Sequence, residues 1–110
     1  MIKKDKETVL FLKRKTLHDL ILFCLFKVTE SKERATIERL VAECFLLFPN
    51  SFELKGYPKW PDSKKLDRAL RSLRKNKLIN GGSKTFFTLT KKGKQEVENM
   101  LKELRQKKLL

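Results

Sequence analysis

The sequence is poor in the residues that build catalytic and metal sites. Its 110 residues include one histidine, His18, and two cysteines, Cys24 and Cys44, without a CxxC spacing. A structural zinc site needs four such ligands, usually in closely spaced pairs. The sequence also lacks a Walker motif, a nucleophile elbow and a paired-carboxylate signature. We therefore expect no enzyme, no metal and no cofactor, and we expect both thiols to be small buried side chains in a reducing cytosol.

Long apolar runs are also missing. The run LILFCLF, Leu20 to Phe26, is far shorter than the ~20 apolar residues that span a bilayer. Asp19 precedes it and no small-residue cleavage site follows, so we do not interpret it as a signal peptide. We expect a soluble cytoplasmic protein without a membrane partner. Because domains cluster near ~100–150 residues, we expect a single domain.

Acidic residues are few, with 13 against 27 lysines and arginines, and the formal net charge is +14. The excess is unevenly distributed. Residues 16–61 carry six charges of each sign, whereas residues 62–84 carry eight basic and two acidic residues. Residues 1–15 and 91–110 each add a net +4. Segregated positive charge of this kind indicates a polyanionic partner, either nucleic acid or an anionic surface.

Two apolar helices are predicted in the neutral part of the chain. Thr16 and Asp19 have the spacing of a capping box, and apolar residues then recur with helical period to Val28. The polar segment SKERA suits a loop that ends in a very short strand. The second helix has Thr36 as its N-cap. It ends before Pro49, because the residue that precedes a proline disfavours the α region.

A third helix is predicted after Pro61, with Asp62 or Ser63 as its N-cap, and it runs to about Asn76. One side is aliphatic and the opposite side is almost purely cationic. Acidic residues normally interleave on a merely solvated helix face, and here only Asp62 and Asp67 are available. This favours contact with nucleic acid. The aliphatic side consists of Leu66, Ala69, Leu70 and Leu73, and the cationic side carries Lys64, Arg68, Arg71 and Lys75, flanked by Lys65 and Arg74.

A β-hairpin and a long polar helix complete the chain. Two short apolar runs flank the turn NGGS, and Asn-Gly tolerates the positive φ angles of tight turns. In the return strand, Phe87 and Leu89 should face the core and Phe86 should point away. The last helix, KKGKQEVENMLKELRQKK, has a narrow apolar stripe: Val97, Met100, Leu101 and Leu104.

The runs ALRSLRKNKLI, NGGSK and FTLTKKG together resemble the winged helix-turn-helix superfamily, in the manner of MarR-like and PadR-like bacterial and archaeal regulators. The matching features are Leu78-Ile79 after the helix, a wing from Asn80 to Lys84, and the pattern Leu-Thr-x-x-Gly from Leu89 to Gly93. The resemblance covers residues 16–95. It implies a mainly α fold with a small β-hairpin (α+β): a three-helix core, a wing and a C-terminal helix. It also implies a transcriptional regulator that binds double-stranded DNA as a homodimer, in an intracellular protein of bacterial, archaeal or phage type.

The resemblance implies that the third helix lies in a DNA major groove and that the wing meets the backbone or minor groove. Arginine suits guanine edges and phosphates, and lysine neutralises phosphate. Ser63, Lys64, Arg68 and Arg71 match the exposed helix positions of such proteins, and Ser83 and Lys84 match the wing tip. To these we add Lys65 and Lys75 as phosphate contacts, and Lys59 and Trp60 as neighbours of the helix start.

One feature departs from the family pattern. A minimal helix-turn-helix joins its helices by ~3–4 residues, whereas thirteen residues from Pro49 to Pro61 intervene here. The aromatic residues of this connection could form a platform for bases, or could pin the loop to the core. We expect Phe52, Leu54 and Tyr57 to pin the loop, and we leave Trp60 open between core and nucleic acid.

The sequence also indicates a candidate dimer interface and leaves a second class of function open. Residues 96–110 extend the last helix and are a candidate dimerisation element, and residues 1–15 form a basic arm or a short extra element. The alternative is that the last helix packs on the first within one chain. The protein could instead be a winged-helix interaction module or an assembly subunit of a nucleoprotein or phage-defence complex, and RNA binding ranks below DNA binding. The candidate dimer interface is Leu22, Phe23, Phe26, Val97, Met100, Leu101 and Leu104.

Overall fold

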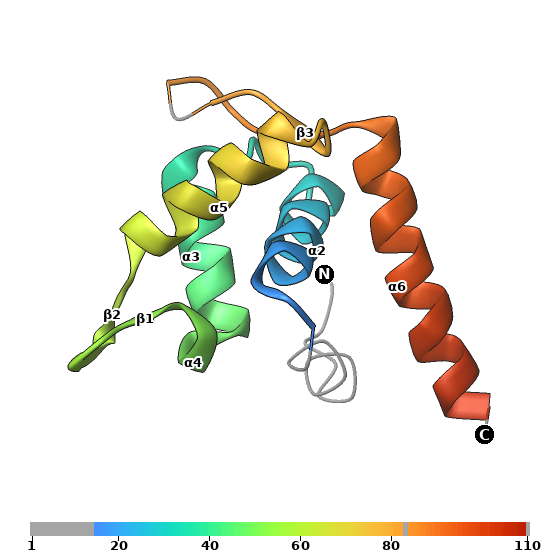
Figure 1. Ribbon diagram of the computed structural model, residues 1–110, viewed down its shortest axis with the longest axis horizontal. Helices are drawn as coiled ribbons and strands as arrows, with labels where there is room; N and C mark the ends of the chain where they lie inside the picture. Colours follow the sequence, from blue (N-terminus) through green and yellow to red (C-terminus); the bar gives the residue numbers. More distant parts are fainter. Residues whose placement is uncertain (1–14, 83, 110) are drawn as a thin grey trace.

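The computed structural model describes residues 15–82 and 84–109, which form a mainly helical fold with small antiparallel hairpins (Figure 1). The predicted basic arm and Ser83 of the predicted wing lie outside the described residues, apart from Lys15. The elements are α2 (Leu17–Glu30), α3 (Ile37–Leu47), α4 (Pro49–Phe52), β1 (Glu53–Leu54), β2 (Tyr57–Pro61), α5 (Ser63–Lys75), β3 (Ile79–Asn80), β4 (Thr88–Leu89) and α6 (Lys91–Leu109).

Helix α2 lies at the centre, with α3 and α6 on either side and α5 packed across it (Figure 1). Thr16 is the N-cap of α2, as predicted, because its Oγ1 accepts a hydrogen bond from the backbone N–H of Asp19 at 3.3 Å. Both apolar faces of α2 are covered by neighbouring elements of the same chain. Its buried residues are Leu20, Ile21, Leu22, Phe23, Cys24, Leu25 and Val28.

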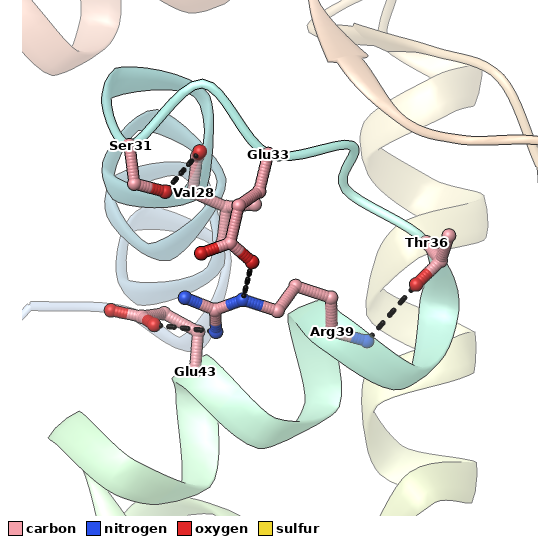
Figure 2. Close-up of polar contacts among 6 residues, drawn as sticks. All are labelled: Val28, Ser31, Glu33, Thr36, Arg39 and Glu43. Atoms are coloured by element: carbon pink, nitrogen blue, oxygen red, sulfur yellow. Dashed lines mark hydrogen bonds and ion pairs between the residues drawn. The ribbon is translucent and has the colours of Figure 1, made fainter.

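Arg39 organises the loop between α2 and α3 (Figure 2). Its Nε donates to Glu33 and its Nη1 donates to Glu43, both at 2.7 Å. The hydrogen bond to Glu33 and then that to Glu43 raise the pKa of the Arg39 guanidinium, so the side chain stays charged. Thr36 caps α3 by accepting from the backbone N–H of Arg39 at 3.2 Å, as predicted. The bond to Glu33 joins the loop to the first turn of α3, whereas the bond to Glu43 lies within α3.

The end of this loop pairs with the hairpin of β3 and β4. The backbone N–H of Phe87 donates to the carbonyl of Ala35 at 2.8 Å, which forms an isolated antiparallel bridge. The short strand predicted at the end of SKERA is thus a single bridge residue, Ala35. Phe87 is buried and Phe86 is exposed, so the predicted inward and outward directions are confirmed.

The junction between the β3–β4 hairpin and α6 depends on a close backbone approach. Thr90 immediately precedes α6 and caps its first turn, because its Oγ1 accepts a hydrogen bond from the backbone N–H of Gly93 at 3.0 Å. Gly93 is buried, and a Cβ at this position would overlap the carbonyl oxygen of Leu78. The glycine in the Leu-Thr-x-x-Gly pattern therefore lets α6 approach the segment that follows α5.

The connection between α3 and α5 contains a helical turn and a hairpin that the sequence did not predict. Helix α3 ends before Pro49, as predicted, but Pro49 then opens α4, because proline fits the first position of a helix. Phe52 is buried, as predicted. Leu54 and Tyr57 are 39% and 63% exposed, so the prediction that they pin the loop is wrong. They belong to the hairpin of β1 and β2, which extends away from the core (Figure 1).

Candidate nucleic-acid interface

Helix α5 has one face in the core and the other in solvent. Asp62 is its N-cap, because its Oδ1 accepts from the backbone N–H of Lys65 at 3.0 Å. The predicted aliphatic stripe is buried throughout: Leu66, Ala69, Leu70 and Leu73. The predicted contact residues on this helix are all exposed: Ser63, Lys64, Lys65, Arg68, Arg71 and Lys75.

Two of these cations have partners within the chain. The Arg71 guanidinium lies 3.1 Å from the carboxylate of Asp67, one helical turn earlier. A pair of this kind on a surface contributes only about 0–1 kcal/mol, so it leaves Arg71 available to a ligand. The Lys65 ammonium donates to the carbonyl oxygen of Ser51 at 2.9 Å, which ties the first turn of α5 to α4. Lys65 thus has a structural contact that the sequence did not reveal.

Grooves flank α5 on both sides. The first, of about 590 Å³, lies beside the start of α3 and is lined by Ile37, Ser63, Lys64, Asp67 and Arg68. The second, of about 290 Å³, lies toward the β3–β4 hairpin and is lined by Asp67, Leu70, Arg71, Arg74, Gly82 and Phe87. The exposed face of α5 is therefore a ridge between two hollows that contain cationic side chains.

The loop of the β3–β4 hairpin is attached to the end of α5. Arg74 Nη1 donates to the carbonyl of Gly81 at 3.0 Å. Gly81 has a φ of +99°, and a Cβ there would overlap the carbonyl oxygen of Phe86, so this turn requires glycine. Within the loop, the backbone N–H of Thr85 donates to the carbonyl of Gly82 at 3.1 Å. The loop and the helix thus present a joint surface.

Further cations accompany this hairpin. Lys84 is exposed, and its neighbour Ser83 lies outside the described residues. Arg34, which the sequence did not single out, lies with its guanidinium carbon 5.7 Å from the centre of the Phe86 ring. This distance allows a cation–π interaction, which orients Arg34 beside the hairpin. Only the tertiary structure reveals this position of Arg34, because the Ala35–Phe87 bridge brings the two segments together.

The β1–β2 hairpin carries the remaining predicted contacts. Lys59 is exposed and Trp60 is 64% exposed, so the side chain of Trp60 does not lie in the core. The hairpin leads directly into the N-terminus of α5, since β2 ends at Pro61 and Asp62 caps the helix. The predicted contact residues that the structure describes therefore lie on three consecutive elements: the β1–β2 hairpin, α5 and the β3–β4 hairpin.

The residues predicted for a dimer interface lie inside the monomer. Helices α2 and α6 pack against one another, and Lys15 forms an ion pair of 2.7 Å with Glu103 beside them. The apolar face expected at a subunit interface is occupied by the chain's own α6 and by α3. Leu22, Phe23, Val97, Met100 and Leu104 are buried, and Phe26 and Leu101 are partly buried against the same core.

Neither residues 15–82 nor 84–109 contain a group of three or more His, Cys, Asp or Glu side chains that could hold a metal ion. Cys24 and Cys44 are free and buried. Burial raises the pKa of the Cys24 thiol well above its usual value of 9.0, and the neighbouring Cys44 raises that pKa further. None of the described helices has the length and apolar character to cross a membrane.

Comparisons with known proteins do not assign this surface. No protein-family model, curated protein or solved structure matches the chain. Its interpretation therefore depends on the positions, exposure and charge of its own side chains.

Proposed function

We propose that this chain is a winged helix-turn-helix protein that binds double-stranded DNA and acts as a transcriptional regulator. Helix α5 reads the major groove, and the β3–β4 hairpin serves as the wing and contacts the sugar-phosphate backbone. The regulatory role follows from the resemblance of this element order to small bacterial and archaeal regulators.

The cationic face of α5 carries the proposal. Lys64, Arg68, Arg71 and Lys75 are exposed along one helix whose other face is in the core. A helix fits the major groove of B-DNA, and the arginine fork can bind a guanine edge or a phosphate through two hydrogen bonds. Asp67 is the only acidic residue among residues 63–75, so phosphates meet little repulsion on this face.

The arrangement around α5 supports a winged-helix architecture. The chain passes through α2, the bridge at Ala35, α3, α5 and the β3–β4 hairpin in that order. The Arg74–Gly81 hydrogen bond keeps the hairpin next to α5. A duplex held against α5 would therefore meet Lys84 and Arg34 beside the helix, and these two cations would contact its phosphates.

A salt titration tests the proposal. The full chain is titrated by fluorescence anisotropy against labelled duplex DNA, duplex RNA and single strands at several salt concentrations. If about 5 to 8 phosphates are neutralised, the logarithm of the DNA association constant falls with the logarithm of salt concentration at a slope of about −4 to −7. Absence of duplex binding at low salt would contradict the proposal. Tighter binding of duplex RNA than of duplex DNA would mean that the ligand is RNA.

A charge-matched pair of variants tests the role of α5. The double change Arg68→Ala with Arg71→Ala should weaken duplex binding at least about tenfold, because an arginine contact to a base edge contributes about 1–3 kcal/mol. The control, Lys102→Ala with Arg105→Ala, removes the same charge from exposed positions on α6 and should change affinity about twofold or less. Equal losses in the two variants would mean that α5 is not the reading helix.

A second candidate function is favoured by exposed apolar side chains. Leu46, Leu54, Tyr57 and Trp60 are large and exposed, which is typical of surfaces that contact other proteins. The chain would then be a winged-helix interaction module or an assembly subunit. The charge-matched variants distinguish the two, because the module would show no duplex binding that depends on Arg68 and Arg71.

A further inference from the structure

The β1–β2 hairpin is hydrogen-bonded at its base and exposed at its tip. Its base is fixed where the backbone N–H of Asp62 donates to the carbonyl of the buried Phe52 at 2.6 Å. Leu54 pairs with Tyr57 across a two-residue turn, in which Gly56 has a φ of +84°. A turn of this shape needs a residue that tolerates positive φ. The hairpin thus holds its outer side chains on a defined backbone.

Its aromatic side chains are turned to solvent. Tyr57 is 63% exposed and Trp60 is 64% exposed, with Leu54 opposite Tyr57 in the hairpin. Large aromatic side chains contribute most to stability when they are buried. Two exposed aromatics on a hairpin whose base is packed therefore indicate a surface that another molecule covers.

The surroundings of these rings are cationic. Lys55 and Lys59 are exposed on the same hairpin, next to the rings in the chain. Trp60 is followed three residues later by Ser63, which lines the groove beside α5 together with Lys64 and Arg68. The aromatic surface is therefore continuous with the cationic face of α5 along the chain.

This combination favours nucleic acid with free base faces over a protein partner. Lysine is depleted in the centres of protein–protein interfaces, whereas aromatic rings beside basic side chains are typical of single-strand binding surfaces. Bases within a duplex are already stacked on both faces, so they offer only their edges to a protein. An unpaired base can stack on Trp60 or Tyr57, and each such contact contributes about 1–3 kcal/mol.

We propose that Tyr57 and Trp60 of the β1–β2 hairpin stack unpaired bases, so that the ligand of this chain is duplex DNA with a single-stranded extension. The duplex lies on α5, and the extension leaves past the N-terminus of α5 over the hairpin, where Lys55 and Lys59 neutralise its phosphates. This inference rests on the proposed binding of duplex DNA by α5.

Trp60 supplies a direct test, because it is the only tryptophan of the chain and its fluorescence reports on the hairpin. The full chain is titrated with a blunt duplex, with the same duplex carrying a 3′ or a 5′ extension, and with the isolated single strand. One of the extended duplexes should bind about 5- to 100-fold more tightly than the blunt duplex. It should also quench the Trp60 emission, whereas the blunt duplex should leave that emission nearly unchanged.

Variants separate stacking from other effects. Tyr57→Ala should abolish most of the preference for the extended duplex and leave the affinity for the blunt duplex unchanged. Trp60→Ala should weaken binding of the extended duplex more than binding of the blunt duplex, so that the preference is again lost. Tyr57→Phe keeps a ring and should keep the preference. The matched control is Leu46→Ala, which removes a side chain that is 57% exposed on α3, outside the hairpin. Thermal unfolding followed by circular dichroism checks that each variant is folded.

The outcomes distinguish this inference from the proposed function. Equal affinity for blunt and extended duplexes overturns the stacking inference and leaves duplex binding by α5 intact. Equal quenching by both duplexes also overturns it, because the hairpin would then contact paired DNA. Binding that needs the extension but is unaffected by Arg68→Ala with Arg71→Ala keeps the stacking and overturns the role of α5. Absence of binding to every DNA overturns both.

Discussion

Arg74 and Gly81 join the end of α5 to the loop of the β3–β4 hairpin through one hydrogen bond of 3.0 Å from Nη1 to the carbonyl oxygen. The bond is on the surface, so it adds little to global stability. Its consequence is geometric, because it holds the loop in one position relative to the cationic face of α5.

Removal of this bond should loosen the loop without unfolding the protein. We expect Arg74→Ala to lower the free energy of unfolding by less than about 1 kcal/mol, since the lost bond is exposed. Hydrogen exchange at the backbone amides of Gly82 and Thr85 should become faster. Arg105→Ala, a loss of the same charge from α6, should leave these amides unchanged. Unchanged exchange in Arg74→Ala would show that the bond does not hold the loop.

Gly93 provides a test in which two effects have opposite signs. Helix propensity alone predicts that Gly93→Ala stabilises the protein by up to about 1 kcal/mol. The added methyl would overlap the carbonyl oxygen of Leu78, so we expect destabilisation by about 1–3 kcal/mol, measured by urea unfolding. Lys94→Ala, at an exposed position on the same helix, should change stability by less than about 0.5 kcal/mol. A stabilised Gly93→Ala would rule out the close approach of α6 to Leu78.

Cys24 should make stability fall at alkaline pH. Burial, and then the neighbouring Cys44, raise the pKa of this thiol in the folded state above 9.0, whereas the unfolded chain loses the proton near that value. Above about pH 9 the unfolded state therefore binds fewer protons, and the free energy of unfolding falls by up to about 1.4 kcal/mol per pH unit.

The comparison for this effect is Cys24→Ala, which removes the thiol but keeps the lysines that titrate in the same range. Urea unfolding of the two proteins should give a constant difference in free energy from pH 6 to about pH 8. Above about pH 9, the wild-type protein should lose stability more steeply than the variant. Parallel curves over the whole range would mean that the pKa of Cys24 is not raised by folding.

Local signals accounted for much of the helical framework. Thr16 and Thr36 are predicted as caps and Asp62 as one of two candidates with Ser63, and Thr16, Thr36 and Asp62 each accept the expected backbone hydrogen bond. Such predictions succeed because a cap and a helical apolar stripe involve residues only three or four positions apart. The directions of Phe86 and Phe87 followed likewise from the alternation of a strand.

The connection between α3 and α5 could not be predicted in the same way. Strands β1 and β2 carry mostly exposed side chains, so they lack the alternation of apolar and polar residues that identifies a strand. The aromatic residues suggested burial, and Phe52 is indeed buried, but Tyr57 lies on the hairpin and is exposed. Homodimerisation stays a prediction. The apolar faces assigned to it are covered within the chain, so a dimer would need another surface.

The order of the helices, their caps and the cationic face of α5 follow from short-range patterns in the amino-acid sequence, because the groups involved are close along the chain. The grooves beside α5, the pairing of Ala35 with Phe87 and the contact of Arg74 with Gly81 required the tertiary structure. The same is true of the exposure of Trp60 and the coverage of both faces of α2. The physical reason is that burial depends on which distant elements pack together. A local pattern indicates that a side chain is apolar but does not indicate which element covers it.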